Sequence, residues 1–508
     1  MAPLILIILS LIPLLALFIR NYLLSCKKTN LPPTPPKLPI LGNLHQLGAL
    51  PHQSLWRLSK KYGPVMQFHL GRVPAVVISS PEAAREVMKL HDLATCSRPS
   101  MAGTRRLTYD YLDVAFSPYG DNWRFMRKII ILELFSLKRV RSFRFVREQE
   151  VGLLIDSIVT SGADQINLTE KLYSLTANVT FRMSFGFDYH GTEFDKNKFH
   201  EVIHEAEVVA GSMSAEECFP RGLGWIVDRW TGHQARIDKV FSELDGFFQH
   251  VIDEHVKQGR EGGDGEEDMI DVLLRIYREQ SRQQLGGGGK SLFGIENIKA
   301  VLLNFFLGGI DTAALTVNWA MAELLANPRL MKKAQAQVRS VAGHKNRVTE
   351  DDVDKLEYLK MVIKETLRLH PPAPLLLPRE SISPVKINGY DVPPKTMIYV
   401  NAWGIGRDPN HWPEPDKFLP ERFEDSSLEF KGQSFEYLPF GSGRRVCPGI
   451  HMGTITVEIA LANLLCCFDW KLPDGMTAED VTMEEQSGVS LTVSKKEPLI
   501  LIPVNRMK

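Results

Sequence analysis

A glycine-rich loop close to the C-terminus contains the cysteine best placed for chemistry. Cys447 lies in the segment Phe440-Gly-Ser-Gly-Arg-Arg-Val-Cys-Pro-Gly449, whose glycines allow the backbone to approach a flat cofactor. Backbone N–H groups and a cation such as Arg445 stabilise a cysteine as the thiolate, which is the form that binds metals. Pro448 suits the start of a helix over residues 450–464. Composition and spacing alone therefore indicate an activated cysteine beside cationic residues.

The loop alone leaves two other interpretations of Cys447 open. The residue could be a buried structural cysteine. It could also form a zinc site with His451 at helical spacing, although no further Cys or His nearby completes four ligands. Cys466 and Cys467 fall in an apolar helix, and we expect them in the core.

The segment Gly308-Gly-Ile-Asp-Thr312 lies inside a predicted helix from Glu296 to Ala326. Each glycine costs a helix about 1 kcal/mol relative to alanine, and such a pair permits a kink or the close approach of a ligand. Helical geometry places five residues on one face: Asn304, Gly308, Asp311, Thr312 and Leu315. An acid and an alcohol beside glycines are expected of a functional site. Alternatively, Thr312 bonds only to the preceding turn and Asp311 pairs with a surface lysine.

Shorter motifs supply further charged side chains. Glu365 and Arg368 are three residues apart and share a helix face. Pro420-Glu-Arg-Phe423 adds Arg422, Trp123 precedes Arg127 by one helical turn, and Arg379 follows a stretch with several prolines. Each of these motifs is a weak signal by itself.

In their order along the chain, these motifs resemble those of the cytochrome P-450 family. The loop matches the family's haem-binding signature at each defining position: Phe440, Gly443, Arg445, Cys447 and Gly449. The resemblance implies haem b (heme b, iron protoporphyrin IX) with Cys447 as its thiolate axial ligand. Further contacts to the cofactor are then expected from Trp123, Arg127, Gly308 and Arg379, in which arginines bind the propionates bidentately.

The resemblance also assigns roles to the remaining motifs. Asp311 and Thr312 correspond to the acid and the alcohol that relay protons to dioxygen during its activation. A second alcohol often follows the threonine in the family, and here Ala313 stands at that position. Glu365, Arg368 and Arg422 correspond to a structural ion network.

The resemblance thus implies a haem-thiolate monooxygenase that uses dioxygen and electrons from NADPH. The chain has no flavin or nicotinamide motif, so NADPH-cytochrome P-450 reductase is the expected partner. The motifs are most similar to those of the microsomal class and of the large plant group acting on specialised metabolites. We therefore expect a small hydrophobic substrate of terpenoid, alkaloid, phenolic or oxime type. Two alternatives remain: a haem-thiolate dehydratase or isomerase without net oxygen insertion, and a non-enzymatic membrane-tethered haem or lipid-binding protein.

The elements that must position these residues are mostly helical. Helical periodicity is found over residues 81–90, 121–134, 233–256, 269–280, 296–326 and 355–369. Short β-type runs occur at residues 65–70, 75–78, 385–387, 397–400 and 499–502. The pattern predicts a mainly α protein with small β-sheets, and the resemblance implies one large α-rich domain with a smaller β-rich region.

The N-terminal residues differ in character from the rest of the chain. Residues 2–19 are apolar and uncharged, and basic residues follow the run, so we expect a transmembrane anchor over 1–24 rather than a cleaved signal peptide. A basic and proline-rich hinge follows over 25–43, and the haem-binding domain over 44–508. We expect a single-pass protein of the endoplasmic reticulum membrane whose catalytic domain faces the cytosol. Lys+Arg and Asp+Glu both number 60, which gives no field that would attract nucleic acid.

Overall fold

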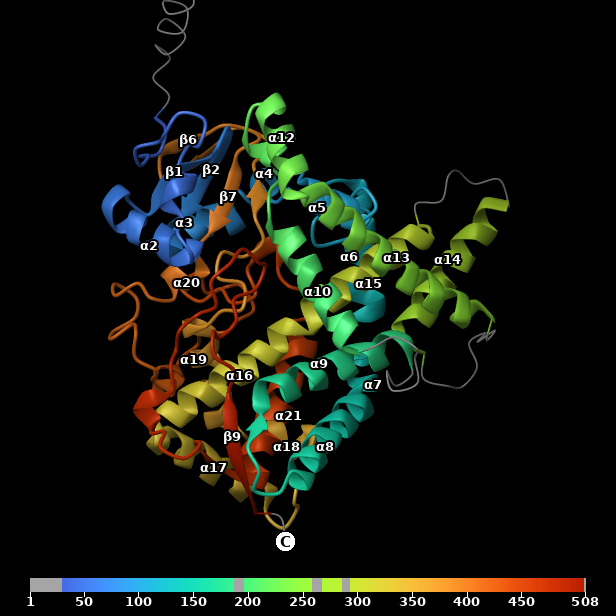
Figure 1. The fold of residues 1–508 in the computed structure, drawn as a ribbon, viewed down its shortest axis with the longest axis vertical. Helices are drawn as coiled ribbons and strands as arrows, with labels where there is room; N and C mark the ends of the chain where they lie inside the picture. Colours follow the sequence, from blue (N-terminus) through green and yellow to red (C-terminus); the bar gives the residue numbers. More distant parts are fainter. Residues whose placement is uncertain (1–29, 187–195, 258–266, 286–292, 507–508) are drawn as a thin grey trace, which may run out of the picture.

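The computed structural model describes residues 30–186, 196–257, 267–285 and 293–506. The expected membrane anchor, part of the hinge and both glycine-rich loops that flank residues 269–285 lie wholly or largely outside these ranges. Within them the chain is mainly helical, as predicted; the strands between residues 65 and 78 and between 390 and 400 lie at one end, and the strand over residues 500–505 lies at the other (Figure 1).

The predicted helices are all present, and the structure adds further helices that were not predicted. The α-helices are α2 (Pro51–Tyr62), α3 (Pro81–Arg85), α4 (Asp92–Thr95), α5 (Ala102–Leu107), α6 (Asp121–Ile129), α7 (Leu137–Ser142), α8 (Arg144–Thr160), α9 (Leu168–Phe185), α10 (Lys196–Gly211), α11 (Ala215–Cys218), α12 (Arg221–Thr231), α13 (His233–Lys257), α14 (Met269–Leu285), α15 (Ile295–Gly309), α16 (Asp311–Ala326), α17 (Pro328–Ala342), α18 (Glu350–Val353), α19 (Glu357–Leu369), α20 (Ala402–Ile405) and α21 (Ile450–Cys467). Two predicted helices end in a π-helical turn: α3 continues as η2 (Glu86–Leu90) and α6 as η3 (Ile130–Leu134).

The strands form three small sheets. The largest has the order β1-β2-β7-β4, and the others are β3-β9-β8 and the hairpin β5-β6. The strands are β1 (Val65–Leu70), β2 (Val73–Ile78), β3 (Ile166–Asn167), β4 (Arg379–Glu380), β5 (Val385–Ile387), β6 (Tyr390–Val392), β7 (Met397–Val400), β8 (Phe468–Lys471) and β9 (Ile500–Asn505). All five predicted strands are confirmed. The two-residue strands β3 and β4 were too short for a sequence pattern to detect.

The central helix is broken where the two glycines predicted a break. α15 ends at Gly309, and α16 begins at Asp311. Between them Ile310 has a ψ of −68°. The N–H of Ile310 donates to the carbonyl of Phe306 and the N–H of Ala314 donates to the carbonyl of Ile310, and both hydrogen bonds are long, at 3.4 Å. α16 packs against α9, α19 and α21 in the core. Among the described residues, only the α15–α16 pair and α21 are long and apolar enough to span a membrane, but both are mostly buried core helices.

Candidate active site around Cys447

The Cys447 loop runs into the N-terminus of α21 and is held by its own backbone. The N–H of Cys447 donates to the carbonyl of Phe440 over 3.0 Å. Gly441 and Gly443 have φ values of +68° and +69°, which other residues rarely adopt. A Cβ on Gly443 would also lie 2.7 Å from a carboxylate oxygen of Asp92. Gly449, with a φ of −86°, is not forced to be glycine in this way.

Burial and the surrounding loop act in opposite directions on the pKa of the Cys447 thiol. Burial raises the pKa of Cys447 above its ordinary value, although the N–H of Gly449 and the charge of Arg127 act in the opposite direction. A coordinating metal deprotonates a thiol outright. A bound metal ion would therefore favour the thiolate form of Cys447.

The cationic residues converge on this loop from distant segments. The Arg445 guanidinium lies 4.2 Å from the centre of the Trp123 ring, and Arg127 donates to the carbonyl of Val446. Arg379 donates to Asp92 over 2.7 Å and to the carbonyl of Ser442. Arg445 itself donates only to main-chain carbonyls, those of Cys96, Val114 and Ser117.

A further arginine, Arg98, belongs to the same cluster and was missed by the sequence reasoning. It is buried and donates to the carbonyls of Ala115, Leu377 and Pro378. No motif spacing marks Arg98. Its only signal is the Arg-Pro pair in a loop between predicted elements.

The buried arginines carry more positive charge than their protein neighbours compensate. Burial, with the charges of Arg379 and Arg127, lowers the pKa of Arg445 to about 9 despite nearby acidic groups. Burial and the charges of Arg445 and Arg379 likewise lower the pKa of Arg98. Buried cations without enough counter-charge are costly. The cluster therefore fits a ligand with two carboxylates, as the propionates of a haem would provide.

The broken central helix presents open space beside this loop. A Cβ on Gly308 would meet nothing within 4 Å, whereas one on Gly309 would lie 2.8 Å from the Thr180 hydroxyl of α9. Gly308 thus leaves room for a ligand, and Gly309 allows α9 to pack closely. The Phe135 ring lies 5.4 Å from that of Phe305 in α15 and within contact distance of a Cβ built on Gly449, so it connects the two halves of the site.

The predicted polar face of this helix is present. The Thr312 hydroxyl donates to the carbonyl of Gly308 over 2.6 Å, and its lone pairs remain available to accept a hydrogen bond. The Asn304 side-chain oxygen accepts from the N–H groups of Val114 and Ala115, which ties the helix to the loop over 108–120. Asp311 is only 4% exposed and forms no ion pair with a lysine or arginine of the described chain.

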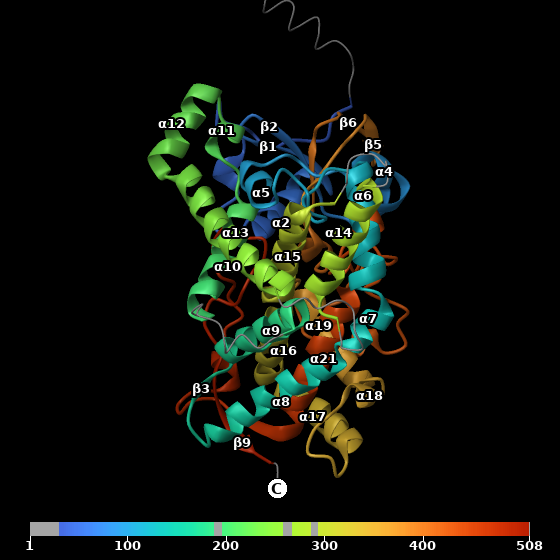
Figure 2. The ribbon, with the colours of Figure 1, turned by 90° about the vertical axis from the view of Figure 1, so that its right-hand side faces the viewer.

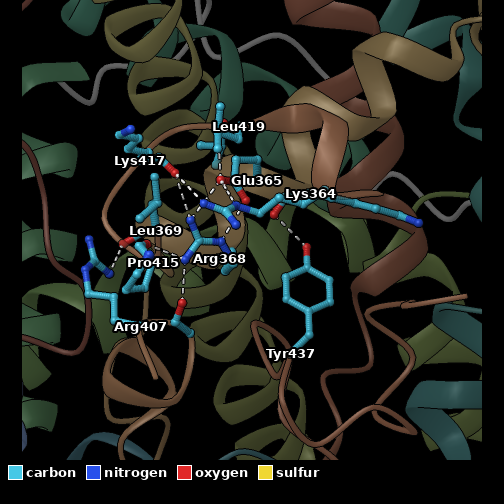
Figure 3. Close-up of polar contacts among 12 residues, drawn as sticks. Lys364, Glu365, Arg368, Leu369, Arg407, Pro415, Lys417, Leu419 and Tyr437 are labelled. Atoms are coloured by element: carbon cyan, nitrogen blue, oxygen red, sulfur yellow. Dashed lines mark hydrogen bonds and ion pairs between the residues drawn. The ribbon is translucent and has the colours of Figure 1, made fainter. Parts of the chain in front are cut away.

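The three residues expected to form an ion network are in contact, and Figure 3 shows Glu365 facing Arg368. Glu365 accepts from the Arg368 Nε and Nη2 atoms over 2.7 and 2.8 Å, and from Arg422 Nε over 3.1 Å. Glu365 also accepts from the N–H of Leu419. Arg368 in turn donates to the carbonyls of Gly406, Pro415 and Lys417.

Comparison with known proteins agrees with this geometry. The family model described as "Cytochrome P450" matches residues 32–501. "Cytochrome P450 71B36" of Arabidopsis thaliana is 52% identical over 475 residues, covering 93% of both chains, and "Cytochrome P450 71B10" of the same plant is 51% identical over 481 residues, covering 94% of both. The solved structure "Zebra fish cytochrome P450 another structure with Abiraterone" has a TM-score of 0.74 at 24% identity, covering 91% of this chain and all of that one. The chain therefore belongs to the cytochrome P450 family, and it is a haem-dependent monooxygenase whose cofactor is haem b with a cysteine thiolate as axial ligand.

Proposed function

We propose that the protein is a membrane-anchored monooxygenase that oxidises a small hydrophobic specialised metabolite, with Cys447 as the axial ligand of the haem. The observation that carries the proposal is the joint presence of a half-buried cysteine, an undercompensated arginine cluster and an open space at Gly308. When bound, a thiolate-ligated haem supplies the redox chemistry that activates dioxygen.

Each group of residues has a separate task in this proposal. Cys447 holds the iron, while Phe440, Gly443 and Gly449 shape the loop that presents the sulfur. Trp123, Arg127, Arg379 and Arg445, together with Arg98, bind the propionates. Glu365, Arg368 and Arg422 hold the chain segments that support the site and take no part in the chemistry.

Asp311 and Thr312 handle protons on the helix side. Reduction of dioxygen with insertion of one oxygen atom consumes two protons, which must reach a site that excludes bulk water. The Thr312 hydroxyl, anchored to the Gly308 carbonyl, can accept a hydrogen bond from a water molecule and orient it. Thr312→Ala should leave haem bound but lower the product formed for each NADPH consumed. Unchanged coupling in this variant would contradict the role of Thr312.

The substrate pocket is expected beside the open space at Gly308. Four segments would line it: residues 107–116, the 304–312 helix face, 371–377 and 488–491. Their side chains are mostly apolar, which suits a hydrophobic ligand. Candidate terpenoids, alkaloids, phenolics and oximes should be screened for a shift in the haem spin state. Single-methyl differences in pocket shape will decide which of them bind.

Membrane attachment is supported by exposed apolar residues at one end of the molecule. α12 exposes Leu223, Trp225, Ile226 and Trp230, the last of them 88% exposed. Asn30 is hydrogen-bonded to Asp391 of β6, and β6 lies at the same end as α12 in both views (Figures 1 and 2). This surface fits contact with lipid beside an anchor formed by residues 1–24. A single-pass location in the endoplasmic reticulum, with the catalytic domain in the cytosol, follows from the basic residues after that segment.

Electrons are then supplied by NADPH-cytochrome P-450 reductase in the same membrane. The experiment that tests the proposal is turnover in membranes with this reductase, NADPH and isotopically labelled dioxygen. One labelled oxygen atom in the product is expected. A product without label, formed without NADPH consumption, would instead favour a dehydratase or isomerase.

A further inference from the structure

A second buried acid lies beside Asp311. Glu207 of α10 is 0% exposed, and α10 packs against α15 next to the helix break. One carboxylate oxygen of Glu207, one of Asp311 and a ring nitrogen of His204 all lie within 4.8 Å of one another. Neither the catalysis assigned to Asp311 and Thr312 nor the sequence motifs account for Glu207.

The hydrogen bonds around Glu207 leave one oxygen for Asp311. Glu207 Oε2 accepts from the Thr492 hydroxyl over 2.7 Å and from the Ser490 hydroxyl over 3.3 Å. Apart from each other, Glu207 Oε1 and Asp311 Oδ1 have no hydrogen-bond partner among the described residues. Two carboxylate oxygens can form a hydrogen bond only if one of them carries a proton.

The electrostatics favour a single shared proton. Burial, followed by the charge of Asp311, raises the pKa of Glu207 well above its ordinary value. Burial also raises the pKa of Asp311, but the nearby His200 and His204 and the contact with Glu207 oppose that rise. Like charges this close cannot both ionise. The two carboxyl groups therefore hold one proton between them at neutral pH.

The groups that face the pair come from three segments. α10 contributes His200 and the exposed His204, α9 contributes Tyr173, and the C-terminal segment contributes the hydroxyls of Ser490 and Thr492. Burial and both acids raise the pKa of Tyr173, so its phenol stays neutral. His204 is the member of this set that reaches solvent.

We propose that Glu207 and Asp311 share one proton and that this proton passes through Asp311 toward Thr312 during turnover. The Glu207 carboxylic acid gives its proton to the Asp311 carboxylate, Asp311 releases it toward Thr312, and the resulting Glu207 carboxylate is reprotonated from solvent on the His204 side. The steps move protons only. Glu207 is thus a positioning residue that acts through Asp311. The relay rests on the proposed monooxygenase function, whereas the shared proton exists in the resting protein.

The first test measures the proton directly. Infrared spectra of the full-length resting protein in H₂O and D₂O should show the carbonyl stretch of a buried carboxylic acid. Glu207→Gln should remove that band, and Thr492→Val, which deletes a hydrogen bond to the same carboxyl, should shift it. The exposed Glu201 of the same helix supplies the matched control Glu201→Gln, which should leave the band unchanged. A band that persists unaltered in Glu207→Gln would overturn the inference. So would stoichiometric zinc that is lost in this variant, because a metal ion would then neutralise the pair.

The second test measures turnover. Glu207→Gln keeps the size and the acceptor for Thr492 but cannot release a proton. It should lower kcat by about tenfold or more and raise the solvent isotope effect, while KM stays within about twofold. A similar loss in kcat/KM that arises from a higher KM, with kcat unchanged, would overturn the relay. If the wild type inserts no labelled oxygen, the proposed function fails. If it inserts oxygen but lacks the Glu207 band, the inference alone fails.

Discussion

Replacing Glu365 tests how far the buried ion network supports the fold. Glu365 and the Arg368 side chain are both 0% exposed, and four N–H groups donate to the Glu365 carboxylate. Glu365→Gln keeps the shape but removes the charge and turns an N–H group toward an arginine. Arg368 is then left as a buried cation without its anion.

The contacts of Arg368 indicate how much the free energy of unfolding should fall. Removing one partner of a buried pair typically costs about 3–5 kcal/mol. Arg368 Nη1 and Nη2 keep hydrogen bonds to the carbonyls of Gly406, Pro415 and Lys417, so only its Nε–H depends on the side chain at position 365. We therefore expect the lower end, about 3 kcal/mol, which corresponds to roughly a hundredfold change in the folding equilibrium.

Guanidinium unfolding of the haem-loaded protein, followed by circular dichroism and by haem absorbance, measures this change. Glu357 lies on the exposed side of the same helix, α19, and Glu357→Gln is the matched control, expected to change stability by less than about 0.5 kcal/mol. A loss below about 1 kcal/mol in Glu365→Gln would refute the argument, because the network would then be dispensable for folding.

Three further predictions concern the cofactor, pH and the membrane. Cys447→Ala should abolish the long-wavelength carbon-monoxide band of thiolate-ligated haem, whereas Cys466→Ala should retain it; a band that survives in Cys447→Ala would exclude this ligand. Burial raises the pKa of Glu458 from 4.5 to about 7, so its stabilising contribution is complete below pH 4.5 and lost as pH rises through 7. Glu458→Gln should therefore differ little from wild type at pH 5 but be more stable by up to about 3 kcal/mol at pH 8 in thermal unfolding. Replacing Trp225 and Trp230 by serine should weaken binding of the protein lacking residues 1–24 to liposomes, and equal binding would argue against α12 as a lipid contact.

Helices and strands could be predicted where the sequence repeats a pattern over enough residues. The helix from 296 to 326, with its break at two glycines, was predictable because apolar periodicity and glycine propensity are local properties. The two-residue strands β3 and β4 form only because β9 and β7 already offer an edge. The π-helical ends of α3 and α6 likewise depend on neighbours and leave no mark in composition.

The residues of the site were likewise predictable only where a local sequence pattern marks them. Cys447 and its loop were predictable because the motif is continuous in sequence, and Glu365 and Arg368 because they share a helical face. Arg98 and Glu207 have no local signal, since each becomes significant only when segments more than 100 residues away pack against it. The sign of the Cys447 pKa shift also escaped prediction, because burial depends on the whole fold.

The distribution of charge inside the molecule connects these observations. The chain has equal numbers of acidic and basic residues, and buried pairs such as Glu365–Arg368 neutralise each other, but two sets of charged groups around the site do not. Buried arginines with lowered pKa values surround the Cys447 loop, and two acids with raised pKa values lie on the helix side. Neither set neutralises the other. The arginines are therefore suited to bind an anionic ligand, and the two acids are suited to hold a proton. Because a ligand that binds only the folded state stabilises it, haem loading should stabilise the protein through the arginines, and the acid pair should keep its proton whether or not haem is bound.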